Sequence, residues 1–323
     1  MNRRHLLKAL AAGLGSSGIA LNAWARVDQA RIYAGYPAGT AVDTLGRQLA
    51  ERMRPAYANS LVVENKTGAS GQLAVLATKA GRADGTTLLV SPISTFSVVP
   101  HTFSKVAFDP FSDLIPVGSC TKNDFALAVG PSVPREVDDL PKYLAWCKAN
   151  PRSASFGSGA TGTKIHFAGV RLGQLAGVKL EHVGYSNAGA AMTDLVGANL
   201  PAYVGSVPTV IPFAQKIRIL ATTGSQRSRF LPDVPTLSEA GYKELAFDES
   251  MGLYLPRGTA QETVELLYRS MAEAMRSPAV AETLAVAGIE VRVGSGAELA
   301  QQIRAESAFW GGIVKSLGFK QDS

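Results

Sequence analysis

The chain has 323 residues, of which 46% are hydrophobic and 18% charged, so it can form two globular lobes and is too apolar to be mainly disordered. Its formal net charge is +6, but residues 1–25 hold three of the 32 basic residues and no acidic ones, which leaves 29 basic against 26 acidic residues. No basic run interleaved with aromatic residues remains, which argues against nucleic acid as a partner. The mild positive balance suits a small anionic ligand.

The first 25 residues have the features of an export signal. A basic start with Arg3 and Arg4 precedes an apolar stretch from Ala9 to Leu21, and Ala23-Trp24-Ala25 is an A-x-A cleavage site. The apolar stretch is too short and too rich in glycine to span a bilayer as a stable helix. The paired arginines fit a twin-arginine signal, and an ordinary Sec signal is the alternative. We therefore expect a signal peptide over 1–25 and export to the periplasm by one of these routes.

The first part of the mature chain alternates predicted strands and helices. We expect strands over 31–34, 61–64 and 87–90, and helices over 42–54 and 71–80, from the spacing of their apolar residues. This βαβαβ order predicts a parallel sheet covered by helices.

The middle of the chain repeats this alternation. Strands are expected over 125–129, 154–156, 180–183 and 217–222, and helices over 140–149, 164–175 and 188–196. A strand over 252–255 and helices near 260–275, 278–287 and 297–317 follow. The sequence thus predicts an α/β protein of two doubly wound lobes around a cleft. Residues 26–123 and 227–323 are assigned to lobe 1 and residues 124–226 to lobe 2.

Four glycine-rich turns each join a predicted strand to the next helix, at residues 36–43, 65–71, 157–163 and 185–189. In open α/β sheets ligands bind beyond the carboxyl ends of the strands, where all four turns fall. The first N–H groups of a helix lack partners within the helix and, with the helix dipole, attract an anion. One terminus contributes only about 0.3–2 kcal/mol, so we expect several turns to converge on one ligand. For each turn taken alone, the alternative is a capped turn between strand and helix that binds no ligand.

Two of these turns carry capping residues. Thr40 and Asp43 have the spacing of a capping box, and Asn187 can cap the helix that follows it.

The third turn also matches a cofactor pattern. Gly157, Gly159 and Gly162 form G-x-G-x-x-G, and Glu181 follows about 20 residues on, which is most of a dinucleotide fingerprint. The export signal argues against this function, because nicotinamide cofactors are cytoplasmic reagents. Glu181 also falls inside its predicted strand. We expect no cofactor, and an NAD-binding oxidoreductase stays an alternative.

Catalytic and metal-binding patterns are scarce. The sequence has no G-x-S-x-G elbow, and its two cysteines and the three histidines after residue 25 lack metal-ligand spacing. We expect no enzyme, no catalytic residue and no metal, with an exported enzyme acting on a carboxylate as the other alternative. Cys120 and Cys147 could form a disulfide in an oxidising compartment, but buried free thiols are favoured.

Several segments together resemble a known family. They include Pro37-Ala38-Gly39 with Asp43, Gly68-Ala69-Ser70-Gly71, Leu231–Thr236 and Pro256–Thr259, and they run over nearly all of the mature chain. In these segments the sequence resembles the substrate-binding receptors of tripartite tricarboxylate transporters, known as Bug receptors. The resemblance implies a fold like that of type II periplasmic binding proteins, a small carboxylate as ligand, and membrane transporter subunits as partners.

The resemblance also implies how the ligand is held, by main-chain N–H groups and ordered water from loops of both lobes. The ligand-binding residues implied for this sequence are Tyr36, Ala38, Gly39, Thr40, Ala41, Asp43, Ser158, Gly159, Thr161, Gly162, Thr163, Tyr185, Asn187, Ala188 and Gly189. The sequence departs from the family pattern at Thr40, Thr86, Pro201 and Ser250, which leaves the identity of the carboxylate open.

Overall fold

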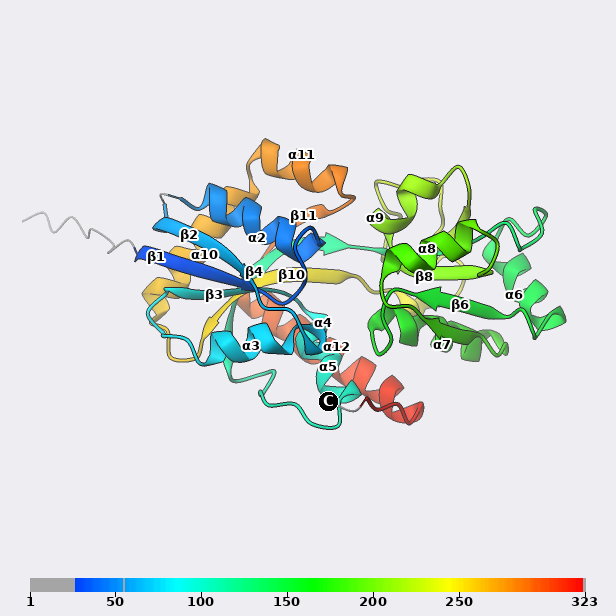
Figure 1. The fold of residues 1–323 in the computed structure, drawn as a ribbon, viewed down its shortest axis with the longest axis horizontal. Helices are drawn as coiled ribbons and strands as arrows, with labels where there is room; N and C mark the ends of the chain where they lie inside the picture. Colours follow the sequence, from blue (N-terminus) through cyan, green and yellow to red (C-terminus); the bar gives the residue numbers. More distant parts are fainter. Residues whose placement is uncertain (1–26, 55, 322–323) are drawn as a thin grey trace, which may run out of the picture.

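The computed structural model describes residues 27–54 and 56–321. The predicted signal peptide and its cleavage site lie outside these residues. Figure 1 shows the described chain as two α/β lobes lying side by side. None of the helices described in this range is long and apolar enough to cross a membrane.

The first lobe contains a six-stranded sheet in the order β11-β4-β10-β3-β1-β2. Its strands are β1 (Val27–Ala34), β2 (Ala58–Asn65), β3 (Thr87–Pro92), β4 (Leu114–Asn123), β10 (Glu249–Pro256) and β11 (Glu290–Ser295). The predicted βαβαβ unit is confirmed, because β1 pairs parallel with both β2 and β3. Strand β10 runs antiparallel between β3 and β4, and β11 runs antiparallel to β4. The associated helices are α2 (Ala41–Arg52), α3 (Gln72–Lys79), α10 (Gln261–Met275) and α11 (Pro278–Val286), with a 3-10 turn, η1, at Ala69–Gly71.

The second lobe contains a five-stranded sheet in the order β7-β6-β8-β5-β9. Its strands are β5 (Phe125–Val129), β6 (Ser155–Ser158), β7 (Glu181–Gly184), β8 (Ala202–Ser206) and β9 (Arg218–Thr222). Strand β6 pairs parallel with β7 and β8, whereas β5 is antiparallel to β8 and β9. The main helices are α6 (Leu140–Ala149), α7 (Lys164–Ala176) and α8 (Ala188–Val196), and the short α9 (Val207–Val210) follows β8.

Sequence patterns did not predict β8, β11 or the full length of β4. Strand β4 contains Pro116 and Gly118, residues that weaken a strand pattern. Strand β8 is short and ends near Gly205, and β11 is a half-exposed edge strand that carries Arg292. These strands form because neighbouring strands supply their hydrogen bonds, which local propensity does not record.

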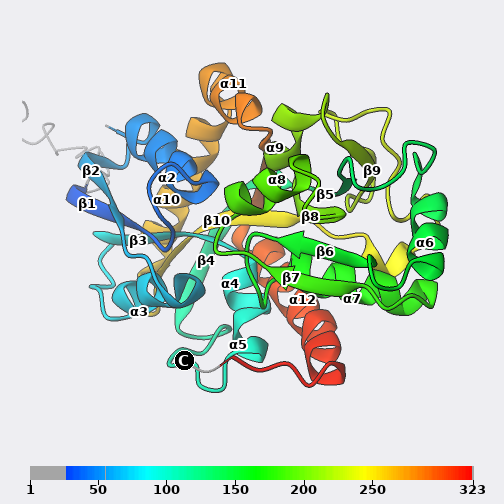
Figure 2. The same cartoon turned by 45° about the vertical axis from the view of Figure 1, so that its right-hand side comes forward.

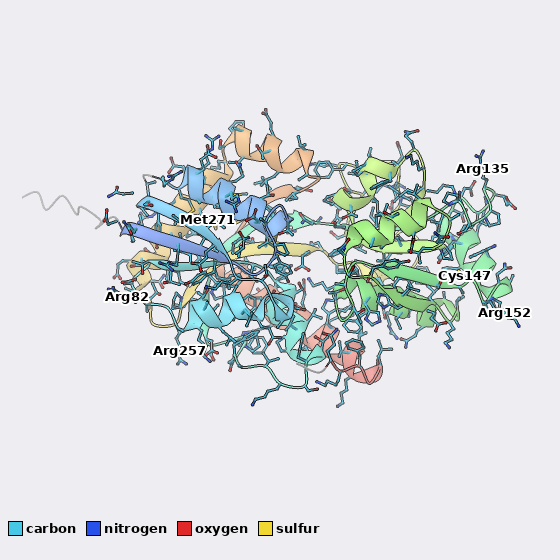
Figure 3. The ribbon with its side chains drawn as sticks, viewed as in Figure 1. Arg82, Arg135, Cys147, Arg152, Arg257 and Met271 are labelled. Atoms are coloured by element: carbon cyan, nitrogen blue, oxygen red, sulfur yellow. The ribbon has the colours of Figure 1, made fainter. Side chains whose placement is uncertain are left out.

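Each lobe has its own hydrophobic core, and the chain passes between them twice. Met271 belongs to a core of the first lobe and Cys147 to a core of the second, and Figure 3 labels both. The first crossing follows β4, and the second precedes β10. Leu237 and Leu245 pack in the core of the second lobe. We therefore propose that lobe 2 begins at residue 124 and extends to about residue 247, beyond the boundary at 226 expected from the sequence.

The last helix joins the lobes at a seam. Helix α12 (Gly296–Ser316) contacts α4 (Ser94–Ser97) and α5 (Val99–Thr102) of the first lobe and α7 of the second. Figure 2 shows α12 passing below β6 and β7 of the second lobe. Val98, Phe167 and Trp310 form one buried cluster across this seam.

Candidate functional site

The first turn, between β1 and α2, is held together by a buried carboxylate. Asp43 is 3% exposed and accepts hydrogen bonds from the Gly39 N–H (2.9 Å), Arg47 Nε (2.9 Å) and Asn65 Nδ2 (2.8 Å). Burial acts to raise the pKa of Asp43, but the three donors outweigh it and the net pKa is lowered. Thr40 caps the helix by accepting the Asp43 N–H at 3.5 Å. The predicted capping residues are in place, but Asp43 reaches back to Gly39 and not to Thr40.

Two main-chain donors at this turn remain available. The N–H groups of Ala41 and Val42 are the first of α2 and have no acceptor among the described residues. Ala38 and Gly39 are exposed, and Gly39 has a φ of +82°, a conformation that favours glycine.

Tyr36 packs the first turn against the second. Its hydroxyl lies 3.3 Å from the Ser70 carbonyl oxygen, to which it donates, and 3.4 Å from Thr95 Oγ1. Burial raises the pKa of Tyr36 to about 12, so this hydroxyl stays protonated at neutral pH. Ser70 itself has a φ of +56°, in the left-handed region that side chains rarely adopt. The two turns of the first lobe therefore form one connected unit.

The third turn, between β6 and α7, is also braced by side chains. Ser158 is fully buried, and its Oγ lies 3.0 Å from the Ala160 carbonyl oxygen and 2.8 Å from His182 Nε2. Thr163 donates to the same carbonyl oxygen at 2.9 Å, and the Gly162 N–H donates to His166 Nδ1 at 3.2 Å.

The exposed part of this turn lies just before α7. Thr161 is exposed, and its carbonyl oxygen accepts a hydrogen bond from Gln321 Nε2 at 3.1 Å. The N–H groups of Lys164 and Ile165 open the helix and have no acceptor within residues 27–54 and 56–321.

The fourth turn, between β7 and α8, lies directly against the third. Asn187 caps α8 by accepting the Ala190 N–H at 2.9 Å, as predicted, which leaves the N–H groups of Ala188 and Gly189 without an acceptor in the described part of the chain. A Cβ atom on Gly159 would lie 2.7 Å from the Ala188 nitrogen, so glycine is needed for this contact.

Tyr185 is tied down within the second lobe. Its hydroxyl donates to Asp194 Oδ2 at 2.8 Å, and burial followed by this hydrogen bond raises the pKa of Tyr185 to about 12. The Tyr185 N–H also donates to the Ser158 carbonyl oxygen at 3.1 Å, which joins the third and fourth turns.

The two pairs of turns lie at the facing ends of the lobes. In Figure 1, β1 points from the N-terminal end of the first lobe towards the second lobe, and the arrow of β6 points back towards the first. The turns that follow both strands therefore lie on the inner ends, so that both lobes present unpaired helix N–H groups towards one another.

Sequence reasoning missed a buried charge cluster beside these turns. Lys164 Nζ lies 2.5 Å from Glu306 Oε2 and 3.5 Å from Glu249 Oε1. These residues are far apart in the sequence and follow no motif spacing, so no local signal could have grouped them.

The structure argues against a dinucleotide site at the third turn. Glu181 is the first residue of β7, so it lies at the end of the strand opposite the turn. The ribose-binding acid of the dinucleotide fingerprint is needed near the turn, where the cofactor lies.

Ser158 and His182 resemble a catalytic dyad only in their distance. Ser158 is 0% exposed, so a substrate has no access to its hydroxyl. His182 stacks on His166 with ring centroids 3.9 Å apart, and burial lowers the pKa of both imidazoles to about 4. The pair serves to brace the turn.

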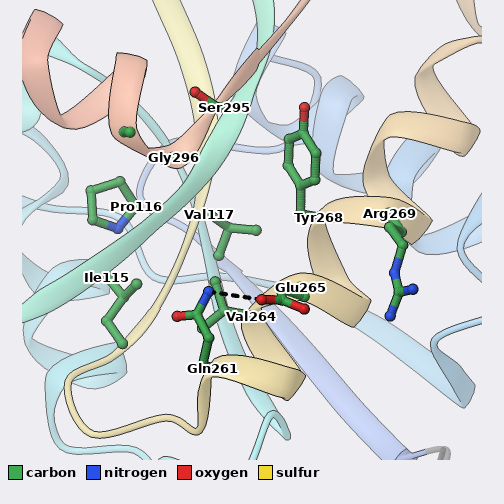
Figure 4. Close-up of a pocket in the computed structure, with 11 residues that line it drawn as sticks. Ile115, Pro116, Val117, Gln261, Val264, Glu265, Tyr268, Arg269, Ser295 and Gly296 are labelled. Atoms are coloured by element: carbon green, nitrogen blue, oxygen red, sulfur yellow. Dashed lines mark hydrogen bonds between the residues drawn. The ribbon is translucent and has the colours of Figure 1, made fainter.

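A separate cavity of about 410 Å³ lies on the first lobe, between β4, α10 and the start of α12. Val117, Tyr268 and Ser295 contribute to its lining, as Figure 4 shows. None of its lining residues belongs to the four turns, so it is distinct from the site described above.

Two α/β lobes, joined by two crossings and presenting helix N-termini to one another, are the architecture of a two-lobed solute-binding protein. The comparisons with known proteins agree with this class. Residues 45–319 match the tripartite tricarboxylate transporter family receptor. Protein BugT of Bordetella pertussis is 29% identical over 326 residues, which cover 99% of each chain.

Solved structures give the same result. A Rhodopseudomonas palustris protein, Rpa4515 with adipate, has a TM-score of 0.80 at 26% identity and covers 91% of this chain and 99% of its own. MatC from the same organism, with bound malate, has a TM-score of 0.75 at 25% identity, with 89% and 99% covered. The chain belongs to the tripartite tricarboxylate transporter receptor family.

Proposed function

We propose that this receptor binds a small mono- or dicarboxylate between its lobes and delivers it unchanged to the membrane subunits of a tripartite transporter. The observation that carries the proposal is the set of unpaired N–H groups at the starts of α2, α7 and α8, which come from both lobes. A carboxylate is an acceptor-only anion of the size that such groups bind. The adipate and malate bound by two related proteins support this ligand class.

The ligand contacts proposed here are main-chain groups, and most of the side chains serve to shape the turns. We assign direct contacts to the N–H groups of Lys164 and Ile165 at the start of α7. Further contacts are assigned to Ala38, Ala41, Thr161, Ala188 and Gly189, which are not fully buried. Gly159 is assigned to the close approach of the third and fourth turns, and Gly39 and Gly162 to the positive φ of +82° and +74° that their turns adopt. The remaining side chains expected from the sequence position the turns through the hydrogen bonds described above; they are Tyr36, Thr40, Asp43, Ser158, Thr163, Tyr185 and Asn187.

Ligand binding should close the lobes on a hinge at the two crossings. One helix terminus contributes at most about 2 kcal/mol, whereas micromolar affinity requires about 8 kcal/mol. Donors from both lobes therefore have to act on the same ligand, and a ligand that bridges the lobes favours the closed arrangement over the open one.

The proposal is tested by a thermal-shift screen of carboxylates, beginning with malate and adipate, followed by calorimetry. The matched control is the neutral amide of each hit (the diamide for a dicarboxylate), which keeps the shape and removes the negative charge. We expect the acids to raise the melting temperature and the amides to have no effect. Equal shifts for acid and amide, or no response to any carboxylate, would contradict the proposal.

The absence of catalysis is tested with the same ligands. After incubation, mass analysis should return each carboxylate unchanged, and added NAD should give no thermal shift. A chemically altered carboxylate would favour an exported enzyme, and stabilisation by NAD would favour the dinucleotide alternative.

We also propose that the mature chain begins near Arg26 in the periplasm. The basis is the A-x-A site at Ala23–Ala25. N-terminal sequencing of the periplasmic fraction tests this, and replacing Arg3 and Arg4 by lysine tests the route. Loss of export in the lysine variant would indicate the twin-arginine route, and normal export would indicate Sec.

A further inference from the structure

One lysine ties the proposed anion-binding turn of the second lobe to the first lobe. Lys164 is the first residue of α7, and its main-chain N–H is one of the unpaired donors of the third turn. Its side chain is 1% exposed and points away from solvent, where Nζ contacts Glu306 Oε2 at 2.5 Å and donates to the Asp248 carbonyl oxygen at 3.0 Å. Glu306 lies on α12, which packs on the first lobe, so a single residue contributes both to the turn and to the contact between lobes.

The contacts continue from Lys164 to the first turn. Lys164 Nζ lies 3.5 Å from Glu249 Oε1, at the start of β10, and the same oxygen accepts the Ser94 N–H at 3.0 Å. The neighbouring Thr95 Oγ1 lies 3.4 Å from the Tyr36 hydroxyl. An unbroken series of contacts therefore links the start of α7 in the second lobe to the first turn of the first lobe.

The lysine of the buried cluster keeps its charge. Burial lowers the pKa of Lys164, but the negative charges of Glu249 and Glu306 outweigh burial, so the net pKa is raised and the ammonium stays charged. A buried ion pair is weak evidence for stability, because desolvation offsets much of the attraction. Its geometry is specific, however, and it joins α7 to α12 beside the apolar cluster that contains Phe167 and Trp310.

We propose that Lys164 is a positioning residue for ligand binding, which holds the third turn where its N–H groups face the donors of the first lobe. This inference rests on the proposed function and adds to it the residue that couples the two halves of the site. Lys164 itself does not touch the ligand through its side chain. Its removal should let the lobes spread and should weaken the affinity for any ligand that both lobes hold.

The test compares Lys164→Met with the double variant Lys164→Met/Glu306→Gln. The single variant leaves two carboxylates without their cation, so it loses both stability and affinity. The double variant removes one of these charges, so it should regain thermal stability but not affinity. The matched control is Lys142→Met, since Lys142 forms an exposed ion pair with Asp138 at 2.6 Å in the same lobe.

Three quantities are measured: the melting temperature, the dissociation constant for malate and adipate, and the radius of gyration of the ligand-free protein by small-angle scattering. We expect both Lys164 variants to bind at least tenfold more weakly and to have a larger radius of gyration, and the Lys142 variant to match the wild type. Affinity that recovers together with the melting temperature in the double variant would overturn the proposal and reduce Lys164 to a stabilising residue. An unchanged radius of gyration in both Lys164 variants would also overturn it.

The outcome is separable from the proposed function. If the wild-type protein binds no carboxylate, the proposed function fails, while the radius of gyration of the ligand-free variants still decides whether Lys164 sets the arrangement of the lobes.

Discussion

Gly159→Ala is the sharpest perturbation of the proposed site, because the structure defines the clash. The new Cβ would lie 2.7 Å from the Ala188 nitrogen and 2.9 Å from its Cα, both backbone atoms that cannot rotate away. Ordinary contact starts at 3.4 Å, so the third and fourth turns have to separate by roughly 0.7 Å. This displaces the N–H groups at the start of α8 from a ligand that the start of α7 also holds.

The size of the effect follows from the bonds that are displaced. A hydrogen bond to a charged group contributes about 1.5–3 kcal/mol, so the loss of one weakens binding roughly 10- to 150-fold. The overpacking itself costs about 1–3 kcal/mol of folding stability. Calorimetry with a carboxylate found by the screen measures the first quantity, and urea unfolding measures the second.

Gly177→Ala is the matched control, because it separates backbone strain from the effect on the site. Gly177 ends α7 with a φ of +65° and has no atom within 4 Å of its would-be Cβ. We expect it to lose about 1 kcal/mol of stability and no affinity. If Gly159→Ala binds like the wild type while losing stability, the third and fourth turns are structural and the reasoning is refuted.

Three further predictions concern pH and thiols. Burial raises the pKa of Glu249 to about 7 from 4.5. Between these pH values the folded state retains a proton that the unfolded chain releases, so folding stability falls by on the order of 1–3 kcal/mol as pH rises from 4.5 through 7. Urea melts of Glu249→Gln should vary less with pH, and an unaltered profile would contradict this. The lowered pKa of Asp43 acts oppositely: its contribution to folding stability is present above pH 3.8 and is lost as pH falls through the folded pKa. Asp43→Asn should therefore lower the free energy of unfolding by about 1–3 kcal/mol at pH 7 and by less in acid. A variant as stable as the wild type at pH 7 would count against this prediction. Cys120 and Cys147 are buried and free, so a thiol reagent should label neither in the native protein and both in denaturant, whereas no labelling in denaturant would indicate a disulfide.

The local sequence was enough to predict much of the first lobe and the positions of the turns. The capping side chains of Thr40 and Asn187 act within three residues, so their spacing alone predicted the starts of α2 and α8. The apolar pattern likewise gave the parallel β1-β2-β3 unit, because each βα unit is specified over a short stretch. Such features need no knowledge of distant residues.

Other features were decided only by the tertiary structure. Strand β11 exists because β4 pairs with it, and Asp43 serves as a brace because Asn65 and Arg47 converge on it. The cluster of Lys164 with Glu249 and Glu306 draws on three elements that meet only when the lobes assemble. The sequence alone determined which turns offer unpaired N–H groups, since helix starts are set locally. Which side chains brace those turns, and what holds the two lobes' turns face to face, depended on contacts between distant segments, whose strength comes from burial and charge and leaves no periodic pattern in the chain.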